Sequence, residues 1–266
     1  MHNHSTTQAA HSLVEEVREL HMVQLTDCHL FADPDAHLQD YNTRLSFERV
    51  LDAIGKNEPA CDLLLATGDL SQDESAGSYR YLASKLDALG IPVAWLPGNH
   101  DDLSVMAESF HGENILEERH LLLGNWHLVL LDSTIPGQVQ GRVSAEQITF
   151  MHDSLLQHAD RHALVCLHHP AIPCGSDWLD QKSLTNHDQF RRAVLRHDQV
   201  RGVVWGHVHQ EGNFQRDDKL WLSSPSTCIQ FKPDSAQFAL DNQPPGYRRL
   251  ILGTDGRIDS AVIRVS

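Results

Sequence analysis

The chain has 266 residues, of which 41% are hydrophobic and 21% charged, ordinary proportions for a globular domain. Its formal net charge of −15 argues against a long nucleic-acid partner, because an acidic body repels a phosphate backbone. No stretch approaches the length of a membrane span, and residues 1–20 lack the apolar segment of a secretory signal. Five cysteines without paired spacing suggest reduced thiols, so we expect a cytoplasmic protein.

The length favours one domain over residues 21–266, preceded by a polar N-terminal extension over residues 1–20. Residues 14–20 are either a short amphipathic helix or a frayed start. Nineteen histidines is a high count, and many of them fall in tails, loops or polar helical stretches, where we expect solvated surface positions. These are His2, His4, His11, His111, His120, His152, His158, His162 and His197.

The first third of the chain alternates between strand and helix patterns. Short apolar runs at 22–26, 63–67 and 93–96 predict buried strands, since each is bounded by Gly, Pro or Asn. Apolar residues at helical spacing over 42–56 and 74–89 place a helix between successive strands. This order predicts a parallel sheet with right-handed crossovers.

The remainder predicts further strands and two more helices. Runs at 121–123 and 126–131 flank a Gly124-Asn125 turn and should pair antiparallel. Ser144 begins a capping-box helix to about residue 158, and Asn186 is a plausible cap for a second helix. Strands are expected at 163–167, 202–205, 220–223, 227–231, 247–252 and 258–265. One α/β domain of two packed mixed sheets with outer helices fits this order.

Five of the predicted strands are each followed directly by polar residues suited to metal binding. The patches are Asp27-Cys28-His29, Gly68-Asp69, Gly98-Asn99-His100-Asp101, His168-His169-Pro170 and Gly206-His207-Val208-His209. Open α/β sheets place ligand sites at the carboxyl ends of their strands, so we expect the patches to meet. Each patch alone could be a helix cap, a tight turn or a packing glycine. Their joint, ordered occurrence favours a two-metal site.

The residue types fit such a site. Carboxylate and imidazole ligands suit hard or borderline cations, and Fe, Mn and Zn alike. Asp69 stands alone after its strand and is the natural bridge between two ions. The pairs Asp27 with His29 and His207 with His209 can each turn toward an ion, and Asn99 and His168 complete the set. Cys28 should face away from its two neighbours and pack in the core.

His100 has a different predicted role. It directly follows a ligand, so its ring should lie beside the metals, where it can donate a proton to a leaving alkoxide with Asp101 orienting it. Two metals about 3.5–4 Å apart can lower the pKa of a bridging water and hold both oxygens of a displacement at phosphorus. Residue spacing therefore predicts hydrolysis of phosphoesters.

The ordered patches resemble the signature of the calcineurin-like metallophosphoesterase superfamily, D-x-H, G-D, G-N-H-D, a lone His and G-H-x-H, over residues 22 to about 209. The resemblance implies a four-layer α/β/β/α sandwich with a dinuclear metal site at the carboxyl ends of the strands. It implies one metal held by Asp27, His29, Asp69 and His209, and a second held by Asp69, Asn99, His168 and His207. His100 takes the place of the proton-donating histidine, and His168 rather than His169 is the ligand, because the family pattern reads H-x-P.

Residues 178–186 and 224–233 narrow the resemblance to the bacterial class III cyclic-AMP phosphodiesterases. This implies hydrolysis of 3′,5′-cyclic AMP to 5′-AMP, with a metal-bound hydroxide attacking phosphorus and His100 assisting the leaving O3′. The implied metals are Fe²⁺ or Mn²⁺, with Zn²⁺ as a third option. The catalytic residues are then His100 and Asp69, and those that contact substrate are His29, Asp69, Asn99, His100, His168 and His209.

The expected partner is a small anionic cyclic nucleotide, with no nucleic acid or membrane, in a monomer or homodimer. Two alternatives use the same fold: another phosphodiesterase, for example one that cleaves glycerophosphodiesters, and a non-catalytic scaffold. The scaffold is disfavoured because none of the ligands is missing. Trp178 and Phe231 are either core residues or nucleobase contacts.

Overall fold

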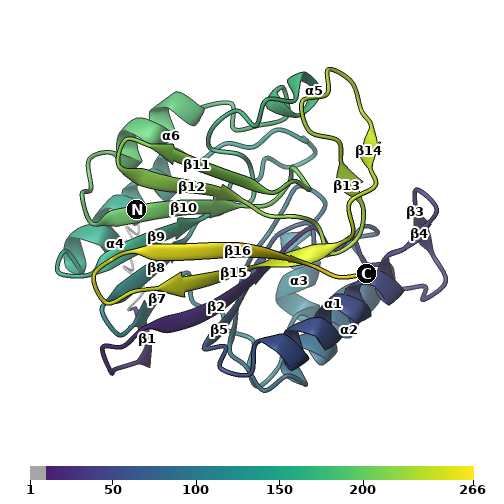
Figure 1. Ribbon diagram of the computed structural model, residues 1–266, viewed down its shortest axis with the longest axis horizontal. Helices are drawn as coiled ribbons and strands as arrows, with labels where there is room; N and C mark the ends of the chain where they lie inside the picture. Colours follow the sequence, from purple (N-terminus) through teal and green to yellow (C-terminus); the bar gives the residue numbers. More distant parts are fainter. Residues whose placement is uncertain (1–9) are drawn as a thin grey trace, which may run out of the picture.

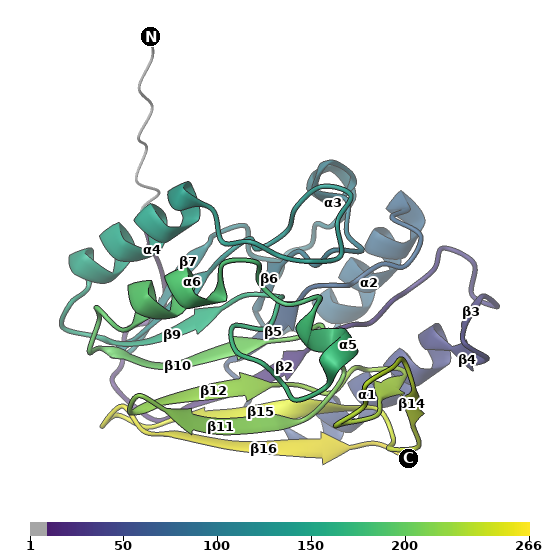
Figure 2. The same ribbon diagram turned by 90° about the horizontal axis from the view of Figure 1, so that it is seen from above.

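The computed structural model describes residues 10–266, so His2 and His4 lie outside the described residues. Two β-sheets pack face to face, and helices cover the outer side of each (Figure 1). Turned by 90°, the molecule shows α4 and α6 over one end and α1 and α2 at the other (Figure 2). The four layers predicted from the family resemblance are therefore present.

The first sheet contains the predicted parallel core. Within residues 10–266 its strand order is β16-β15-β2-β5-β6, with β2, β5 and β6 parallel and β15 antiparallel to both of its neighbours. Its strands are β2 (Leu20–Leu25), β5 (Leu63–Thr67), β6 (Val93–Leu96), β15 (Gly246–Leu252) and β16 (Ile258–Arg264). The accompanying helices are α1 (Thr43–Asn57), α2 (Ala76–Asp87) and α3 (Leu103–Ser109).

The second sheet has the order β1-β7-β8-β9-β10-β12-β11 within the described chain, and its β7–β8 hairpin is antiparallel as predicted. Its strands are β1 (His11–Val14), β7 (His120–Leu123), β8 (Trp126–Leu130), β9 (His162–Cys166), β10 (Val200–Trp205), β11 (Gly212–Arg216) and β12 (Lys219–Ser223). Helices α4 (Ala145–Gln157), α5 (Asp177–Asp180) and α6 (His187–Val194) accompany it. Two short ribbons are formed by β3 (His37–Leu38) with β4 (Tyr41–Asn42), and by β13 (Gln230–Phe231) with β14 (Leu240–Asp241).

Three apolar clusters separate the layers. Side chains alternate between the two faces of a strand, so β2 sends Leu20 and Met22 between the sheets and Val23 and Leu25 toward the helices. The middle cluster contains residues from both sheets, including Leu164. Fully burying an aliphatic side chain of this size contributes about 1.5–3 kcal/mol. These packed layers hold the strand ends that carry the five patches in fixed relative positions.

The N-terminal segment differs from the expected helix or frayed start at residues 14–20. Strand β1 pairs parallel with β7, His11 lying opposite Leu121, and the strand extends to Val14. Beyond it, Arg18 donates to the Asp62 carboxylate, which fixes the path of the chain toward β2. Backbone pairing with a sheet edge outweighs the weak helical spacing of three apolar residues.

Two of the histidines expected at the surface are buried. His120 is 0% exposed and packs edge-on against Phe150, with 5.5 Å between ring centroids. His197 is 5% exposed, and its Nε2 lies 3.0 Å from Nδ1 of His152. Helices α4 and α6 cover these positions, which a local reading of polarity misses. His11 and His111 are exposed as expected, and the remaining three are half-buried.

Other local expectations need smaller corrections. Ser144 caps α4 by accepting from the Gln147 amide, as predicted. Asn186 starts α6 but makes no side-chain cap, because its amide bonds to the backbone of Val143 instead. The expected strand at 227–231 is reduced to β13, and β11 was not foreseen because its residues are polar and partly exposed.

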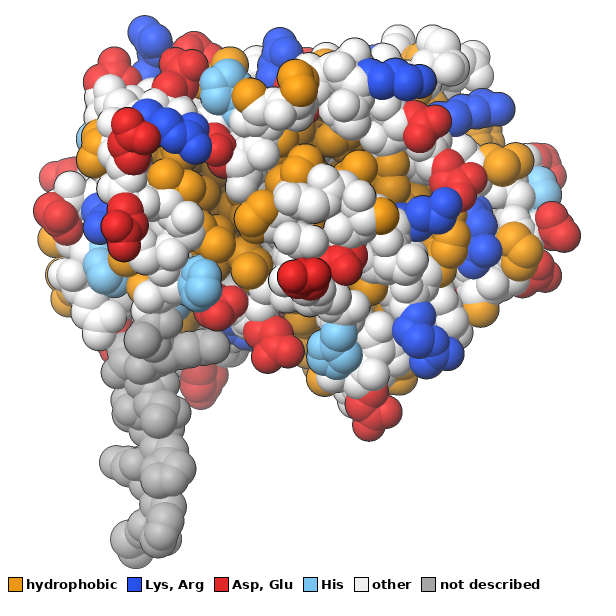
Figure 3. Space-filling view, turned by 90° about the horizontal axis from the view of Figure 1, so that it is seen from below, with side chains coloured by type: hydrophobic (Ala, Val, Ile, Leu, Met, Phe, Trp, Pro, Cys, Tyr) orange, Lys and Arg blue, Asp and Glu red, His pale blue; other side chains and the backbone are white. Residues whose placement is uncertain are grey.

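None of the helices within residues 10–266 is long and apolar enough to cross a membrane. On the face seen from below Figure 1, acidic and basic side chains are interspersed with apolar ones (Figure 3). The surface there carries both signs of charge, within a chain whose net charge is −15.

Candidate metal centre

The structure brings all seven predicted ligands to one place, where the carboxyl ends of β2, β5 and β6 meet those of β9 and β10. Four overlapping groups of side chains have potential ligand atoms within 4.8 Å of one another. They are Asp27–His29–His209, Asp27–Asp69–His168, His168–His169–His207 and His29–Asp69–His100. The shared members of these groups make one continuous polar centre between the two sheets.

The ligand-bearing turns have a left-handed backbone at five of the proposed ligands. The backbone φ is positive at Asp27 (54°), His29 (46°), Asp69 (50°), His207 (67°) and His209 (48°). Positive φ is uncommon for residues other than glycine and persists only where surrounding contacts enforce it. The Asp27 amide donates to the Gly68 carbonyl and the His29 amide to the Asp69 carbonyl, each at 2.9 Å. These bonds hold two strained turns against each other and direct their side chains inward.

Cys28 is fully buried in the apolar cluster beneath α1 and α2, as predicted. The reason differs, since the turn rather than an extended segment directs it away from its neighbours. Glycines permit the close approach of the turns. A side chain at Gly68 (φ 91°) would place its Cβ 2.6 Å from both the Gly98 nitrogen and His168 Nδ1. At Gly206 a Cβ would lie 2.8 Å from a carboxylate oxygen of Asp27.

The first half of the centre is formed by His29, His209 and Asp27. His29 Nδ1 donates to Gln72 Oε1 at 2.8 Å, and His209 Nδ1 donates to the Ile229 carbonyl at 2.9 Å. Each neutral ring therefore carries its lone pair on Nε2. These two lone-pair nitrogens lie 3.2 Å apart, and His209 Nε2 lies 3.3 Å from Asp27 Oδ1. Three acceptor atoms at such distances repel one another unless they share a cation.

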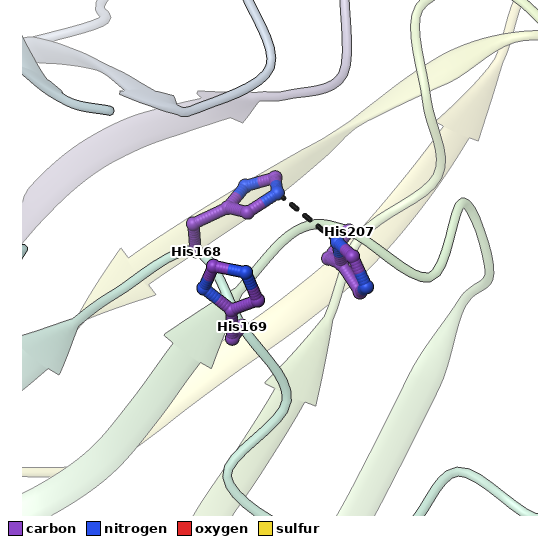
Figure 4. A group of neighbouring side chains, drawn as sticks. All are labelled: His168, His169 and His207. Atoms are coloured by element: carbon purple, nitrogen blue, oxygen red, sulfur yellow. Dashed lines mark hydrogen bonds between the residues drawn. The ribbon is translucent and has the colours of Figure 1, made fainter. Parts of the chain in front are cut away.

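The second half of the centre, formed by His168, His207 and Asp69, has a similar arrangement. His168 Nδ1 donates to the Thr67 carbonyl at 2.8 Å, so its Nε2 faces Asp69 Oδ2 at 3.3 Å. His207 Nδ1 lies 3.2 Å from the same Nε2, as the dashed line in Figure 4 shows. Burial lowers the pKa of His168, but the charge of Asp69 and the hydrogen bond to it, together with the charge of Asp27 and the Thr67 carbonyl, outweigh burial and raise this pKa to about 9. The carboxylate thus favours a positive charge at this point.

Two further atoms lack partners in the described part of the chain. Asn99 Oδ1 and His207 Nε2 are both buried without a hydrogen bond. A buried acceptor without a partner costs about 1–3 kcal/mol, so such atoms call for an ion or another ligand. Converging lone pairs, two carboxylates and an orphaned amide oxygen match the donor set of hard or borderline divalent cations. The residues present therefore fit a dinuclear centre, and the hydrogen bonds that His29, His168 and His209 donate from Nδ1 are the usual support for a metal-binding histidine.

His169 lies beside this centre, but both of its nitrogens have other partners. Nδ1 lies 2.8 Å from Ser133 Oγ, and Nε2 lies 3.2 Å from the Val139 carbonyl. Its ring packs at 4.9 Å from that of His207 (Figure 4). This arrangement favours His168 as the ligand. His169 instead connects the loop at residues 133–139 to the centre through its hydrogen bonds.

His100 lines the cleft beside the ligands, with its ring edge-on to His29 at 5.1 Å between centroids. Its backbone amide donates to Asp69 Oδ1 at 2.9 Å. The prediction that Asp101 orients the ring is wrong. Asp101 turns away to accept from the amides of Leu70, Ser71 and Gly98, and Gln72 Nε2 instead donates to His100 Nδ1 at 3.4 Å.

Asp101 therefore fastens two ligand loops to each other, and burial followed by the nearby Asp69 charge raises its pKa to about 6. Gln72 is the residue that sequence reasoning missed. It lies three positions after Asp69 and belongs to no metal-binding pattern, so only its contacts with His29 and His100 reveal it.

Opposite the ligands, the cleft is walled by apolar and aromatic side chains. Phe231 stacks on His209 with 4.1 Å between centroids and 15° between planes. Trp178 meets Phe231 edge-on at 5.0 Å. Both line the same cleft as His100, so neither is solely a core residue.

The chain belongs to the calcineurin-like phosphoesterase family, which residues 20–211 match. Proteins of this family use a dinuclear centre of divalent cations, and the clusters described above could hold one.

Relatives and solved structures agree with this assignment. The chain is 40% identical to the 3′,5′-cyclic adenosine monophosphate phosphodiesterase CpdA of Pseudomonas aeruginosa, covering 100% of this chain and 95% of that protein. It is 37% identical to the protein of the same name from Escherichia coli, covering 92% and 90%. Among solved structures it is similar to a dimetal phosphatase from Danio rerio (TM-score 0.63, 15% identity, 93% and 99% covered). A purple acid phosphatase from yellow lupin is also similar (TM-score 0.62, 13% identity, 97% and 54% covered). The two structural similarities concern the fold.

Proposed function

We propose that this chain hydrolyses 3′,5′-cyclic AMP to 5′-AMP at a dinuclear metal centre. The observation that carries the proposal is the convergence of Nε2 atoms from three histidines, His29, His168 and His209, on the two buried carboxylates of Asp27 and Asp69, beside a cleft with an aromatic wall. The named activity of relatives that are 37–40% identical over nearly the whole chain supports cyclic AMP as the substrate.

The proposed ligand sets are those of the family resemblance. One metal is assigned to Asp27, His29, Asp69 and His209, and the other to Asp69, Asn99, His168 and His207. Asp69 suits the bridging position because it lies 3.3 Å from His168 and 3.8 Å from His29, one residue of each set. We propose Fe²⁺ or Mn²⁺ as the resident ions, with Zn²⁺ also compatible with these donors.

When bound, two cations supply a water of lowered pKa and a positive clamp for the phosphate oxygens. The side chains of the protein orient the substrate and donate a proton to the leaving oxygen. We propose that Asn99 and the ligand histidines contact the phosphate group of the substrate. The residues to which we assign substrate contacts are His29, Asp69, Asn99, His100, His168 and His209. His100 is half-buried, lines the same cleft and donates its proton to O3′ as the bond to phosphorus breaks. Gln72 positions the neutral ring, with its Nε2 3.4 Å from His100 Nδ1.

The first test is turnover of cyclic AMP by purified protein that has been stripped of metal and reloaded with Mn²⁺ or Fe²⁺. Bis(p-nitrophenyl) phosphate, a diester without a base, is assayed beside it. Release of 5′-AMP together with hydrolysis of the diester is the expected result. Hydrolysis of the diester alone would leave a phosphodiesterase with another substrate, such as a glycerophosphodiester. Inactivity on both substrates with two metals bound would favour the alternative that the protein is a non-catalytic scaffold.

We also propose that the protein works in the cytoplasm. All five cysteines, which lie within the described residues, are free thiols, as expected in a reducing compartment.

A further inference from the structure

The part of the cleft that faces away from the metal ligands has a distinct chemistry. Its wall is formed by Val139, Trp178, Leu179 and Phe231, and its charged group is the half-buried Lys182. These residues come from three separate loops or short elements. His29, Asp69, Asn99, His207, His209 and His100 line the same cleft. A ligand whose phosphate contacts the ligand side therefore extends its remaining atoms along this wall.

The aromatic residues of the wall are held in place by one another. Phe231 lies flat against His209 at 4.1 Å, which fixes the distance between the wall and the metal ligands. Phe238, which is 52% exposed, closes on both Trp178 and Phe231 with edge-on contacts of 5.3 and 5.7 Å. An aromatic face beside a phosphate site is what stacking of a nucleobase requires.

Lys182 is a cation without an acidic partner. Its Nζ lies 4.6 Å above the Trp178 ring, and within residues 10–266 no carboxylate lies within ion-pair distance of it. Lys182 is half-buried and lines the cleft, in a chain of net charge −15 with 36 acidic residues. Its three N–H donors are available to a ligand that enters over Trp178.

We infer that Trp178, Phe231 and Lys182 form a nucleobase subsite, an assignment that rests on the proposed phosphodiesterase function. The base stacks on the face of one of these two rings, which lie 75° apart, and Lys182 donates to its ring nitrogen or carbonyl acceptors. Guanine offers O6 and N7 side by side, whereas adenine pairs N7 with an amino donor that a lysine repels. No side chain among these five wall residues carries an acceptor that could select the adenine amino group. The subsite therefore admits guanine as well as adenine.

The test measures binding rather than turnover, so it does not depend on the proposed reaction. Calorimetric titration of 5′-GMP, 5′-AMP and inorganic phosphate into Mn²⁺-loaded protein gives three dissociation constants for each variant. Lys182→Met removes the donor, Lys182→Arg retains one, and Lys232→Met removes an exposed lysine outside the cleft as a matched control. Metal content is measured for every variant.

For Lys182→Met we expect the Kd of 5′-GMP to rise about tenfold and that of 5′-AMP about threefold, with the Kd of phosphate unchanged. Lys182→Arg should restore most of the affinity, and Lys232→Met should match the wild type. Unchanged nucleotide affinities in Lys182→Met would overturn the inference, and so would an equal loss of phosphate affinity, since that would place Lys182 on the phosphate. If cyclic AMP is not hydrolysed while these shifts appear, the proposed substrate fails and the subsite stands.

Discussion

His127 makes the stability of this protein sensitive to acid. It lies on β8, is 0% exposed, and neither ring nitrogen has a hydrogen-bond partner in the described chain. Burial lowers the pKa of His127 from 6.5 to about 3, and the adjacent His158, 5.0 Å away between ring centroids, adds to this effect. Folding therefore keeps the ring neutral over a pH range in which the unfolded chain binds a proton.

The sign and size follow from proton linkage. Between pH 6.5 and 3 the unfolded state binds more protons than the folded state, so the free energy of unfolding falls as the pH falls. At pH 5, protonation of this one residue stabilises the unfolded chain by about 2 kcal/mol, while about one folded molecule in a hundred is protonated. At pH 7 the effect is a few tenths of a kcal/mol or less.

We predict that His127→Leu reduces the loss of stability between pH 7 and pH 5 by about 2 kcal/mol relative to the wild type. Urea denaturation of both proteins in the metal-free form, followed by circular dichroism at each pH, measures this difference. A change in packing would shift the variant equally at both pH values and so cancels in the comparison. Equal pH dependence in the two proteins would refute the argument that His127 is buried in its neutral form.

Three further predictions concern the centre and the core. His100→Ala should retain both metals by elemental analysis while turnover falls about 10²–10⁴-fold on a substrate with a poor leaving group, and unchanged turnover there would remove His100 from the mechanism. Asp69→Ala should lower metal content as well as activity, so full occupancy of both ions would refute its bridging role. Arg248→Met should lower the free energy of unfolding by about 3 kcal/mol in urea titrations, because it leaves Asn213 Oδ1 and the buried Ser223 carbonyl without their donor. Wild-type stability in that variant would show that water replaces the guanidinium.

Local pattern was sufficient for most of the elements. The runs at 63–67 and 93–96 became β5 and β6 with those bounds, because short apolar stretches between Gly, Pro or Asn have few alternatives to a buried strand. Polar segments were harder to assign from the sequence. The strand β11 and the pairing of β1 depend on backbone hydrogen bonds with distant partners, which leave no trace in side-chain periodicity. His120 was likewise expected to be exposed, because the helix that buries it, α4, is distant from it in the sequence.

For the site, the sequence by itself selected the side chains that we propose carry the chemistry. Strand-end placement and residue type selected the seven proposed ligands and His100, and these depend only on the order of residues along the chain. The tertiary structure decided which atoms of these side chains face the centre. Left-handed turns at Asp27 and Asp69, the tautomers fixed by the Thr67 and Ile229 carbonyls, and the orientation of His100 by Gln72 all arise between segments far apart in the sequence. Lone pairs converge there because the packed sheets hold loops together that would otherwise repel one another.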